Sequence, residues 1–283
     1  MIAQESIGVE TPRTVNKITD YAQFIKLRLS MLVVFSAVMG FIITSGGNTD
    51  WVKMMWLILG GFLVTGSSNG FNQIMERDLD KLMTRTINRP LPQNRMSLTE
   101  AILLASLAGI IGVFILFYFM NPLSGILGAS ALLSYTLLYT PLKRKTPFAV
   151  FVGAFPGAMP PLLGCVAATG GFGEISFYAL LLFIIQFLWQ FPHFWAIAWV
   201  MDDDYKKAGF RMLPSPGGRD KGSAFQIIVY SLSLLMASLL PFMFKMMSNP
   251  AAVIIIVLCG IVFSWQSIKL FRTCAVEEAR QLM

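Results

Sequence analysis

The sequence contains few charged residues. Only 13% of its 283 residues are Asp, Glu, Lys or Arg, whereas 55% are hydrophobic. A soluble globular domain has about 25% charged residues, so this composition excludes an ordinary soluble enzyme and indicates an integral membrane protein. The net charge is +7, but the basic residues stand in short segments between apolar runs. They therefore indicate membrane topology, and no nucleic-acid partner is expected.

Cysteine is also scarce, and a targeting segment is missing. Cys165, Cys259 and Cys274 stand far apart without metal-binding spacing, so neither a metal site nor a disulfide framework is supported. The first twenty residues lack an apolar core and a cleavage-like site, which argues against a secretory signal peptide. They also contain acidic residues, which mitochondrial transit peptides avoid. The simplest location is a bacterial plasma membrane.

Long apolar runs dominate what is present. Eight of them approach or exceed the roughly 20 residues that a membrane-spanning helix needs, at about 22–45, 51–76, 98–119, 123–141, 148–170, 175–200, 223–245 and 250–271. The connections between them are too short for a soluble domain. Because helices satisfy their backbone hydrogen bonds within the segment, the sequence predicts one all-α, polytopic membrane bundle. It forms a single domain over residues 1–283, with a flexible cytoplasmic tail over 1–20.

The basic residues divide unequally between the two ends of these spans. With eight spans, all Lys and Arg residues except Lys53 and Lys245 fall on one face of the membrane. Short cytoplasmic loops carry an excess of Lys and Arg, so this face is predicted to be cytoplasmic, with both termini on it. Omitting one span would destroy this separation, which therefore supports the count of eight.

A row of polar side chains stands at the end of the second apolar run. Asn72, Glu76 and Asp80 are spaced four apart. Four residues turn an α-helix by about 400°, so the three side chains share one face and sit roughly 6 Å apart. That spacing suits a hard cation and a diphosphate. The alternative is that these residues only mark the membrane interface and are neutralised by nearby bases.

Two further polar runs belong to the same face of the membrane. A basic run at 143–145 follows the fourth span, and an acidic run at 202–204 follows the sixth. Either alone reads as a topology signal or a solvated loop. Together with the first row, they suit a magnesium diphosphate beside an apolar interior. Such a site would ionise an isoprenyl diphosphate, with metal and cations stabilising the leaving group.

The only histidine, His193, lies inside the sixth span, directly after Pro192. An ionisable residue within a membrane span is a functional candidate, and a histidine there is suited to haem ligation or proton transfer. It would serve equally well as a hydrogen-bond donor to a neighbouring helix or to the carbonyl that Pro192 leaves free. Pro156, Pro160 and Pro161 in the fifth span, like Pro192, predict kinks or local unwinding.

Four motifs, in order and over nearly the whole chain, resemble those of the UbiA-type intramembrane prenyltransferases. They are Asn72-x-x-x-Glu76-x-x-x-Asp80-x-x-Met83-x-Arg85-Thr86-x-x-Arg89-Pro90-Leu91, then Tyr139-Thr140-x-Leu142-Lys143-Arg144-x-Thr146, Phe191-Pro192-His193-Phe194-Trp195, and Asp204-Tyr205-x-x-Ala208-Gly209-x-x-Met212-Leu213-Pro214. The carboxylate pattern is typical of the superfamily. The extension from Arg85 to Leu91 and the last motif resemble its haem branch, the protohaem IX farnesyltransferases.

The resemblance implies transfer of a farnesyl group from farnesyl diphosphate to a vinyl group of haem b. Water adds, haem O forms and diphosphate leaves; the lipid bilayer and a downstream haem A synthase or terminal oxidase assembly are the implied partners. The implied Mg²⁺ ligands are Asn72, Glu76, Asp80, Asp203 and Asp204, of which all but Asp203 are also implied to be catalytic. The implied substrate-binding residues are Arg28, Arg85, Arg89, Tyr139, Lys143, Arg144, His193, Asp203 and Lys207.

Two departures from the family pattern affect these expectations. Glu76 stands where the superfamily usually has Asp, so Asp78 is an alternative ligand, although it lies off the shared face. The family usually has nine spans, whereas this sequence stops after the eighth. Two other functions remain open: prenylation of an aromatic quinone or chlorophyll precursor, and membrane transport. The clustering of the acids at one face disfavours transport, because a transporter should place polar residues at mid-membrane depth.

Overall fold

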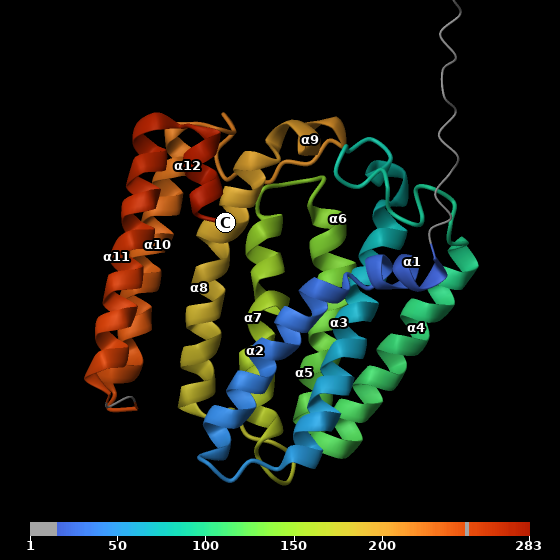
Figure 1. Cartoon of the computed structure of the whole chain (residues 1–283), viewed down its shortest axis with the longest axis vertical. Helices are drawn as coiled ribbons and strands as arrows, with labels where there is room; N and C mark the ends of the chain where they lie inside the picture. The colour runs from blue at the N-terminus through green and yellow to red at the C-terminus, as the bar shows by residue number, and fades with distance from the viewer. Residues whose placement is uncertain (1–15, 247–248) are drawn as a thin grey trace, which may run out of the picture.

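The computed structural model describes residues 16–246 and 249–283, and in these ranges the protein is an all-α bundle (Figure 1). Eight helical segments are long and apolar enough to cross a membrane, which confirms the predicted number. They are α2 (Leu27–Ser45), α3 (Trp51–Asp80), α4 with the π-helical η1 (Leu98–Ile115, Leu116–Met120), α5 with the π-helical η2 and α6 (Pro122–Leu133, Ser134–Tyr139, Thr140–Leu142), α7 (Ala149–Ala167), α8 (Phe177–Val200), α10 (Lys221–Met243) and α11 (Pro250–Thr273).

Polar residues fix where many of these helices begin. The Asp50 carboxylate accepts from two backbone amides in the first turn of α3, and Ser97 forms a capping box with Glu100 at the start of α4. Ser176 and Asp220 accept from backbone amides in the same way at the starts of α8 and α10. Such side chains satisfy amides that have no partner within the helix. The apolar runs of α3, α4, α8 and α10 therefore each begin at a short polar signal.

The first span begins later than the sequence predicts, at Leu27 instead of residue 22. A separate helix, α1 (Lys17–Phe24), precedes it and lies across the end of the bundle (Figure 1). The chain turns between them at Lys26, which has a left-handed φ of 49°. Asn69 and Gln73 of α3 donate to the last carbonyls of α1. These long-range bonds stabilise the break, because buried carbonyls without partners are costly.

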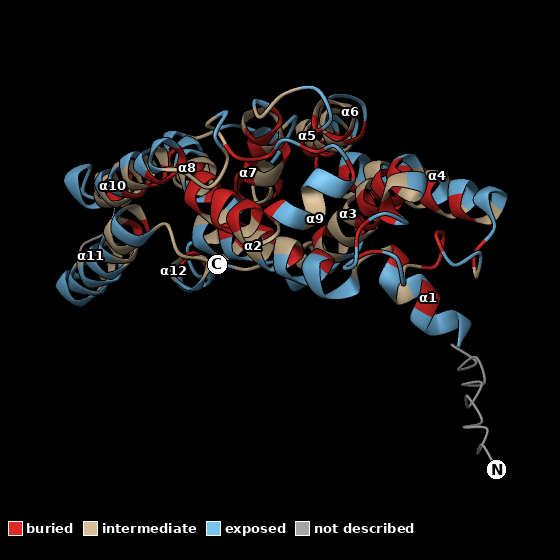
Figure 2. Ribbon diagram, turned by 90° about the horizontal axis from the view of Figure 1, so that it is seen from above, coloured by how far each residue is buried: buried red, intermediate tan, exposed pale blue. Residues whose placement is uncertain are grey.

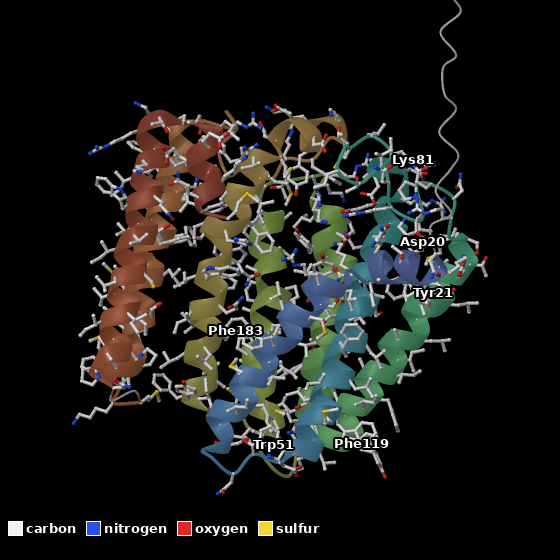
Figure 3. All side chains as sticks on the ribbon, in the orientation of Figure 1. Asp20, Tyr21, Trp51, Lys81, Phe119 and Phe183 are labelled. Atoms are coloured by element: carbon white, nitrogen blue, oxygen red, sulfur yellow. The ribbon has the colours of Figure 1, made fainter. Side chains whose placement is uncertain are left out.

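Helix α1 is docked by charged side chains. Asp20 is buried and pairs with Arg95 at 2.8 Å, while Lys17 and Tyr21 both bond to Glu100. Figure 3 shows Asp20 and Tyr21 at the end of the bundle that carries Lys81, far from Trp51 and Phe119. Residues 1–15 lie outside the described part of the chain, so the tail predicted over 1–20 is untested there; the helix starts at Lys17.

The spans pack around a central core, and small residues bring some of them close together. Helix α2 crosses α7 where Gly164 faces the backbone of Ala37 without room for a side chain. Such close approach is typical of membrane helices. Figure 2 shows that buried residues concentrate in the middle, whereas α10 and α11 at one side expose much of their surface. That exposed surface is apolar, as expected for helices that face lipid.

The prolines do not unwind their helices. Pro156, Pro160 and Pro161 lie inside continuous α7, and Pro192 lies inside continuous α8. The irregular turns within the spans are instead η1 and η2, which contain no proline. After α11, a short helix α12 (Val276–Gln281) packs against α8 and α11.

Candidate active site

The predicted row on α3 faces the interior of the protein. Asn72, Glu76 and Asp80 are 2%, 6% and 0% exposed, so the four-residue spacing does place them on one buried face. Asp78 does not join them, because its side chain is 70% exposed and pairs with Lys81. A buried carboxylate needs a partner of opposite charge or a cation. Glu76 and Asp80 must therefore have such partners, and these partners belong to the site.

Glu76 pairs with Lys143, which follows α6. The Lys143 ammonium lies 2.8 Å from Glu76 Oε1, and both side chains are almost fully buried. The ammonium also lies 4.6 Å from the centre of the Tyr139 ring, within the range of a cation–π interaction. Burial disfavours the charged form of Lys143, but the oxygens of Tyr139 and Glu76 outweigh it and raise its pKa above the ordinary value. Lys143 is therefore a permanent cation in this site.

Asp80 pairs with Arg89 in the loop between α3 and α4, residues 81–97, here called the α3–α4 loop. Arg89 Nη1 donates to both carboxylate oxygens of Asp80, at 2.7 and 2.9 Å. The Thr86 hydroxyl donates to the backbone carbonyl of Asp80 at 2.9 Å. The loop consequently folds back over the end of α3 and brings a guanidinium to the row.

Asn72 contacts Thr140 at the start of α6. Its amide nitrogen donates to Thr140 Oγ1 at 3.3 Å, and that hydroxyl donates to the carbonyl of Tyr135 within η2. Among the described residues, Asn72 Oδ1 and Glu76 Oε2 accept no hydrogen bond from a protein group. These free oxygens, with the Asp80 carboxylate, are the ligand type that Mg²⁺ prefers.

The row fits a metal that shares its ligands with a substrate. In the described ranges, no group of three or more His, Cys, Asp or Glu side chains lies close enough to hold a metal alone. Mg²⁺ commonly binds through one or two carboxylates and completes its shell with phosphate oxygens and water. Glu76 and Asp80 with the Asn72 amide match that pattern, and Lys143 and Arg89 would meet the remaining negative charge.

The break between α1 and α2 adds a cation that the predicted set of site residues lacks. Burial, followed by the positive charges of Arg89 and Lys143, lowers the pKa of Lys26 to about 7. Lys26 therefore shares the electrostatic environment of the α3 row. Arg28, the predicted residue, is exposed, whereas Lys26 is half-buried; both line an outer groove along α1 and α2. The sequence signal was a lysine at the start of the first span.

A cavity of about 490 Å³ opens beside Glu76. This volume is within the range of small-molecule sites. It combines apolar walls with charged side chains, among them the exposed Arg144. The lining residues are Met75, Glu76, Leu79, Thr140, Pro141, Arg144, Lys145 and Phe210.

The second acidic run forms the short helix α9 (Asp202–Lys207), and its acids have other partners. Asp204 accepts from the backbone amides of Thr84 and Arg85 at 3.1 Å each and pairs with Lys207 at 2.9 Å. The hydrogen bond from Lys207, together with those from the two amides, keeps the pKa of Asp204 far below its usual range. The Asp203 side chain is 76% exposed. Through Asp204, helix α9 therefore contacts the backbone of the α3–α4 loop.

The exposed Arg85 and Lys207 lie at this junction of α9 and the α3–α4 loop. The Lys207 ammonium also donates to Thr84 Oγ1 at 3.0 Å. His193 is half-buried on α8 and stacks on Trp189, with ring centres 4.5 Å apart. Nine residues separate it from α9, about 13 Å along a helix. No hydrogen bond or ion pair among the described residues joins it to the α3 row.

Comparisons with known proteins agree with this architecture. The model of the UbiA prenyltransferase family matches residues 33–283. Relatives named "Protoheme IX farnesyltransferase" include one from Christiangramia forsetii, 48% identical over 94% of this chain and 88% of its own length. Another, from Cytophaga hutchinsonii, is 45% identical over 93% of this chain and 91% of its own length.

Two solved structures share the fold at low sequence identity. A digeranylgeranylglyceryl phosphate synthase structure superposes with a TM-score of 0.78 at 21% identity, covering 95% of this chain and 92% of its own. A UbiA homolog from Archaeoglobus fulgidus bound to GPP and Mg²⁺ superposes with a TM-score of 0.68 at 14% identity, covering 93% of this chain and 99% of its own.

Proposed function

This chain belongs to the UbiA prenyltransferase family, and from that membership we propose that it transfers the farnesyl group of farnesyl diphosphate to haem b. The name shared by the relatives that are 45–48% identical supports this donor and acceptor. The observation that carries the proposal is the buried row of Asn72, Glu76 and Asp80, with Lys143 and Arg89 paired to its acids.

The residues of the row and their ion-pair partners, Lys143 and Arg89, contribute in different ways to the release of diphosphate. Asn72, Glu76 and Asp80 would hold Mg²⁺, which would supply Lewis-acid stabilisation of the leaving group. Lys143 and Arg89 neutralise the remaining diphosphate charge, and charged Lys26 adds to this effect. These cations act in a largely buried site, where electrostatic stabilisation is much stronger than in water. The apolar residues of the cavity wall, Met75, Leu79 and Phe210, would contact the farnesyl group and limit the access of water to the allylic cation.

The proposed reaction breaks the C1–oxygen bond of farnesyl diphosphate, the π bond of a haem vinyl group and one O–H bond of water, and it forms a C–C bond and a C–O bond. The bond from C1 of the farnesyl group to the diphosphate oxygen breaks, and C1 joins the terminal carbon of a haem vinyl group. Water adds its hydroxyl to the other vinyl carbon and releases a proton, which gives haem O and diphosphate. We assign His193, beside Trp189 on α8, to the haem side, because it is the only histidine.

The protein is an integral membrane protein, and we propose that the active site opens at the cytoplasmic face of a bacterial plasma membrane. The α3–α4 loop, the segment after α6 and helix α9 all lie at one end of the bundle (Figure 1). This end carries most of the basic residues, which favours the cytoplasmic side. Haem O would then be used by a haem A synthase or a terminal oxidase assembly.

Product analysis with purified protein tests the proposal. The protein is incubated with farnesyl diphosphate, Mg²⁺ and equal amounts of haem b and a 4-hydroxybenzoate-type aromatic acceptor, and products are identified by mass. We expect haem to gain one farnesyl group and one water. Glu76→Gln should reduce turnover by about 100-fold or more, whereas Glu174→Gln, an exposed matched control, should not. Prenylation of the aromatic acceptor with unmodified haem would overturn the proposal.

A further inference from the structure

Asp204 contacts the backbone of the α3–α4 loop through both carboxylate oxygens. Oδ1 accepts from the Thr84 amide at 3.1 Å and from Lys207 at 2.9 Å, while Oδ2 accepts from the Arg85 amide at 3.1 Å. The donors on the loop are about 120 positions away in sequence, so these bonds join helix α9 to the α3–α4 loop, next to the Lys207–Thr84 hydrogen bond and the buried Met83 side chain. Charge-assisted bonds of this kind are roughly twice as strong as neutral ones.

The other side of α9 is fixed to α8 by Arg219. Its guanidinium donates to the carbonyls of Trp199 and Val200 at 2.6 and 3.3 Å, at the end of α8. The same group donates to the exposed Asp203 at 3.0 Å. Because Arg219 binds both Asp203 of α9 and the end of α8, Asp204 has a fixed position relative to the bundle. Its bonds to residues 84 and 85 therefore fix this part of the loop relative to the same helices.

The loop that Asp204 contacts carries Arg85 and Arg89. Arg89 reaches the α3 row through Asp80, whereas the exposed Arg85 has its backbone amide bound directly by Asp204. Without these bonds the loop would keep the Arg89–Asp80 pair and the buried side chains of Met83 and Leu91, but residues 84 and 85 would lose their backbone attachment to α9. The position of Arg85 therefore depends on Asp204 directly, whereas Arg89 is also held by Asp80 and depends on Asp204 only through the loop backbone.

We propose that Asp204 is a positioning residue that latches the α3–α4 loop to α9 and so sets Arg85 and Arg89 for diphosphate binding, in place of a role as a metal ligand. Only the identity of the bound diphosphate, farnesyl diphosphate, is taken from the proposed prenyl transfer. Asp204 Oδ1 already accepts two hydrogen bonds and Oδ2 accepts a third, so a metal there could use only the remaining lone pair of Oδ2, and the neighbouring Asp203 carboxylate is turned to Arg219 through its Oδ2.

Hydrogen exchange and magnesium titration separate the two roles. In the full chain, Asp204→Asn keeps one acceptor but loses the charge and one amide bond. We expect the amides of residues 84–85 to exchange about 10- to 100-fold faster, and the affinity for farnesyl diphosphate at saturating Mg²⁺ to fall by a similar factor. The Mg²⁺ concentration for half-maximal diphosphate binding should stay within about twofold.

Asp203→Asn is the matched control, because it changes the neighbouring, exposed carboxylate, and it should leave exchange at 84–85 unchanged. The inference is overturned if Asp204→Asn leaves that exchange unchanged, or if it raises the Mg²⁺ requirement about tenfold or more while a saturating Mg²⁺ concentration restores diphosphate affinity. Hydrogen exchange needs no turnover, so it reports on the latch even if the acceptor is not haem.

Discussion

At the scale of single residues, the site consists of acids that are buried only because a base is buried with them. Glu76 with Lys143 and Asp80 with Arg89 are ion pairs in which both partners are largely removed from water. Removing one partner of a buried pair costs about 3–5 kcal/mol, whereas the intact pair contributes little net stability. These pairs thus contribute little to stability, and we propose instead that they serve the binding of a charged substrate.

Lys26 predicts a pH dependence of diphosphate binding. Its pKa is lowered from 10.5 to about 7, so it is charged below pH 7 and neutral above. A diphosphate binds the charged form more tightly, so binding above pH 7 must take up a proton and its affinity should fall by up to about tenfold per pH unit. Lys26→Arg stays charged and should flatten this slope when diphosphate binding is measured calorimetrically from pH 6.5 to 9.

The same shift affects folding with a definite sign. Between pH 7 and 10.5, the unfolded chain binds more protons at Lys26 than the folded chain does. The contribution of Lys26 to stability therefore rises with pH across this window and is lowest below pH 7.

Equal slopes of diphosphate affinity against pH in wild type and Lys26→Arg would contradict the assignment of Lys26 to the site.

At the scale of elements, the break between α1 and α2 depends on polar side chains from another helix. Gln73 donates to the carbonyls of Gln23 and Phe24, and Asn69 donates to the carbonyl of Ile25. The apolar run by itself is consistent with one continuous helix. The bonds from α3 supply partners for the carbonyls that a break exposes, and Lys26, whose pKa is lowered by burial and by the charges of Arg89 and Lys143, lies at this break.

Replacing Gln73 should loosen α1 without unfolding the bundle. Gln73→Leu leaves two carbonyls without their donor, at a cost of about 1–3 kcal/mol. We expect faster hydrogen exchange over residues 17–26 and weaker diphosphate binding, with unchanged helix content by circular dichroism. Gln266→Leu in α11 is the matched control, since no hydrogen bond of the Gln266 side chain is recorded among the described residues. Unchanged exchange in Gln73→Leu would show that the docking contacts of α1 suffice to hold it.

At the scale of the whole molecule, the basic residues determine which end of the bundle is expected in the cytoplasm. Lys206 and Lys245 are both exposed, on loops that eight spans place at opposite ends. With Cys259 and Cys274 replaced by Ser and the buried Cys165 kept, one added cysteine at either of these two positions tests the orientation. A membrane-impermeant thiol reagent should label Lys245→Cys in intact cells and Lys206→Cys only after permeabilisation. The reverse pattern would move the active site to the periplasmic face.

The sequence by itself determined the number of spans and the face shared by the α3 row. Both depend on local properties: the length of an apolar run, and the 3.6-residue period that aligns Asn72, Glu76 and Asp80. The predicted ends of the spans differ from the observed ends by a few residues, and these differences also depend on the local sequence. The end of α1 is the exception, because its capping partners come from α3.

Only the tertiary structure decided which groups meet across the bundle. Glu76 and Lys143 are 67 positions apart, and Asp204 is 120 positions from Thr84. No periodicity in the chain relates such pairs, so the sequence alone could not show that Glu76 meets Lys143 or that Asp204 meets the backbone of the α3–α4 loop. Helix packing brings Asp204 to the backbone amides of residues 84 and 85 and Lys143 to Glu76, because buried charges and amides must find partners wherever the packed helices bring them together.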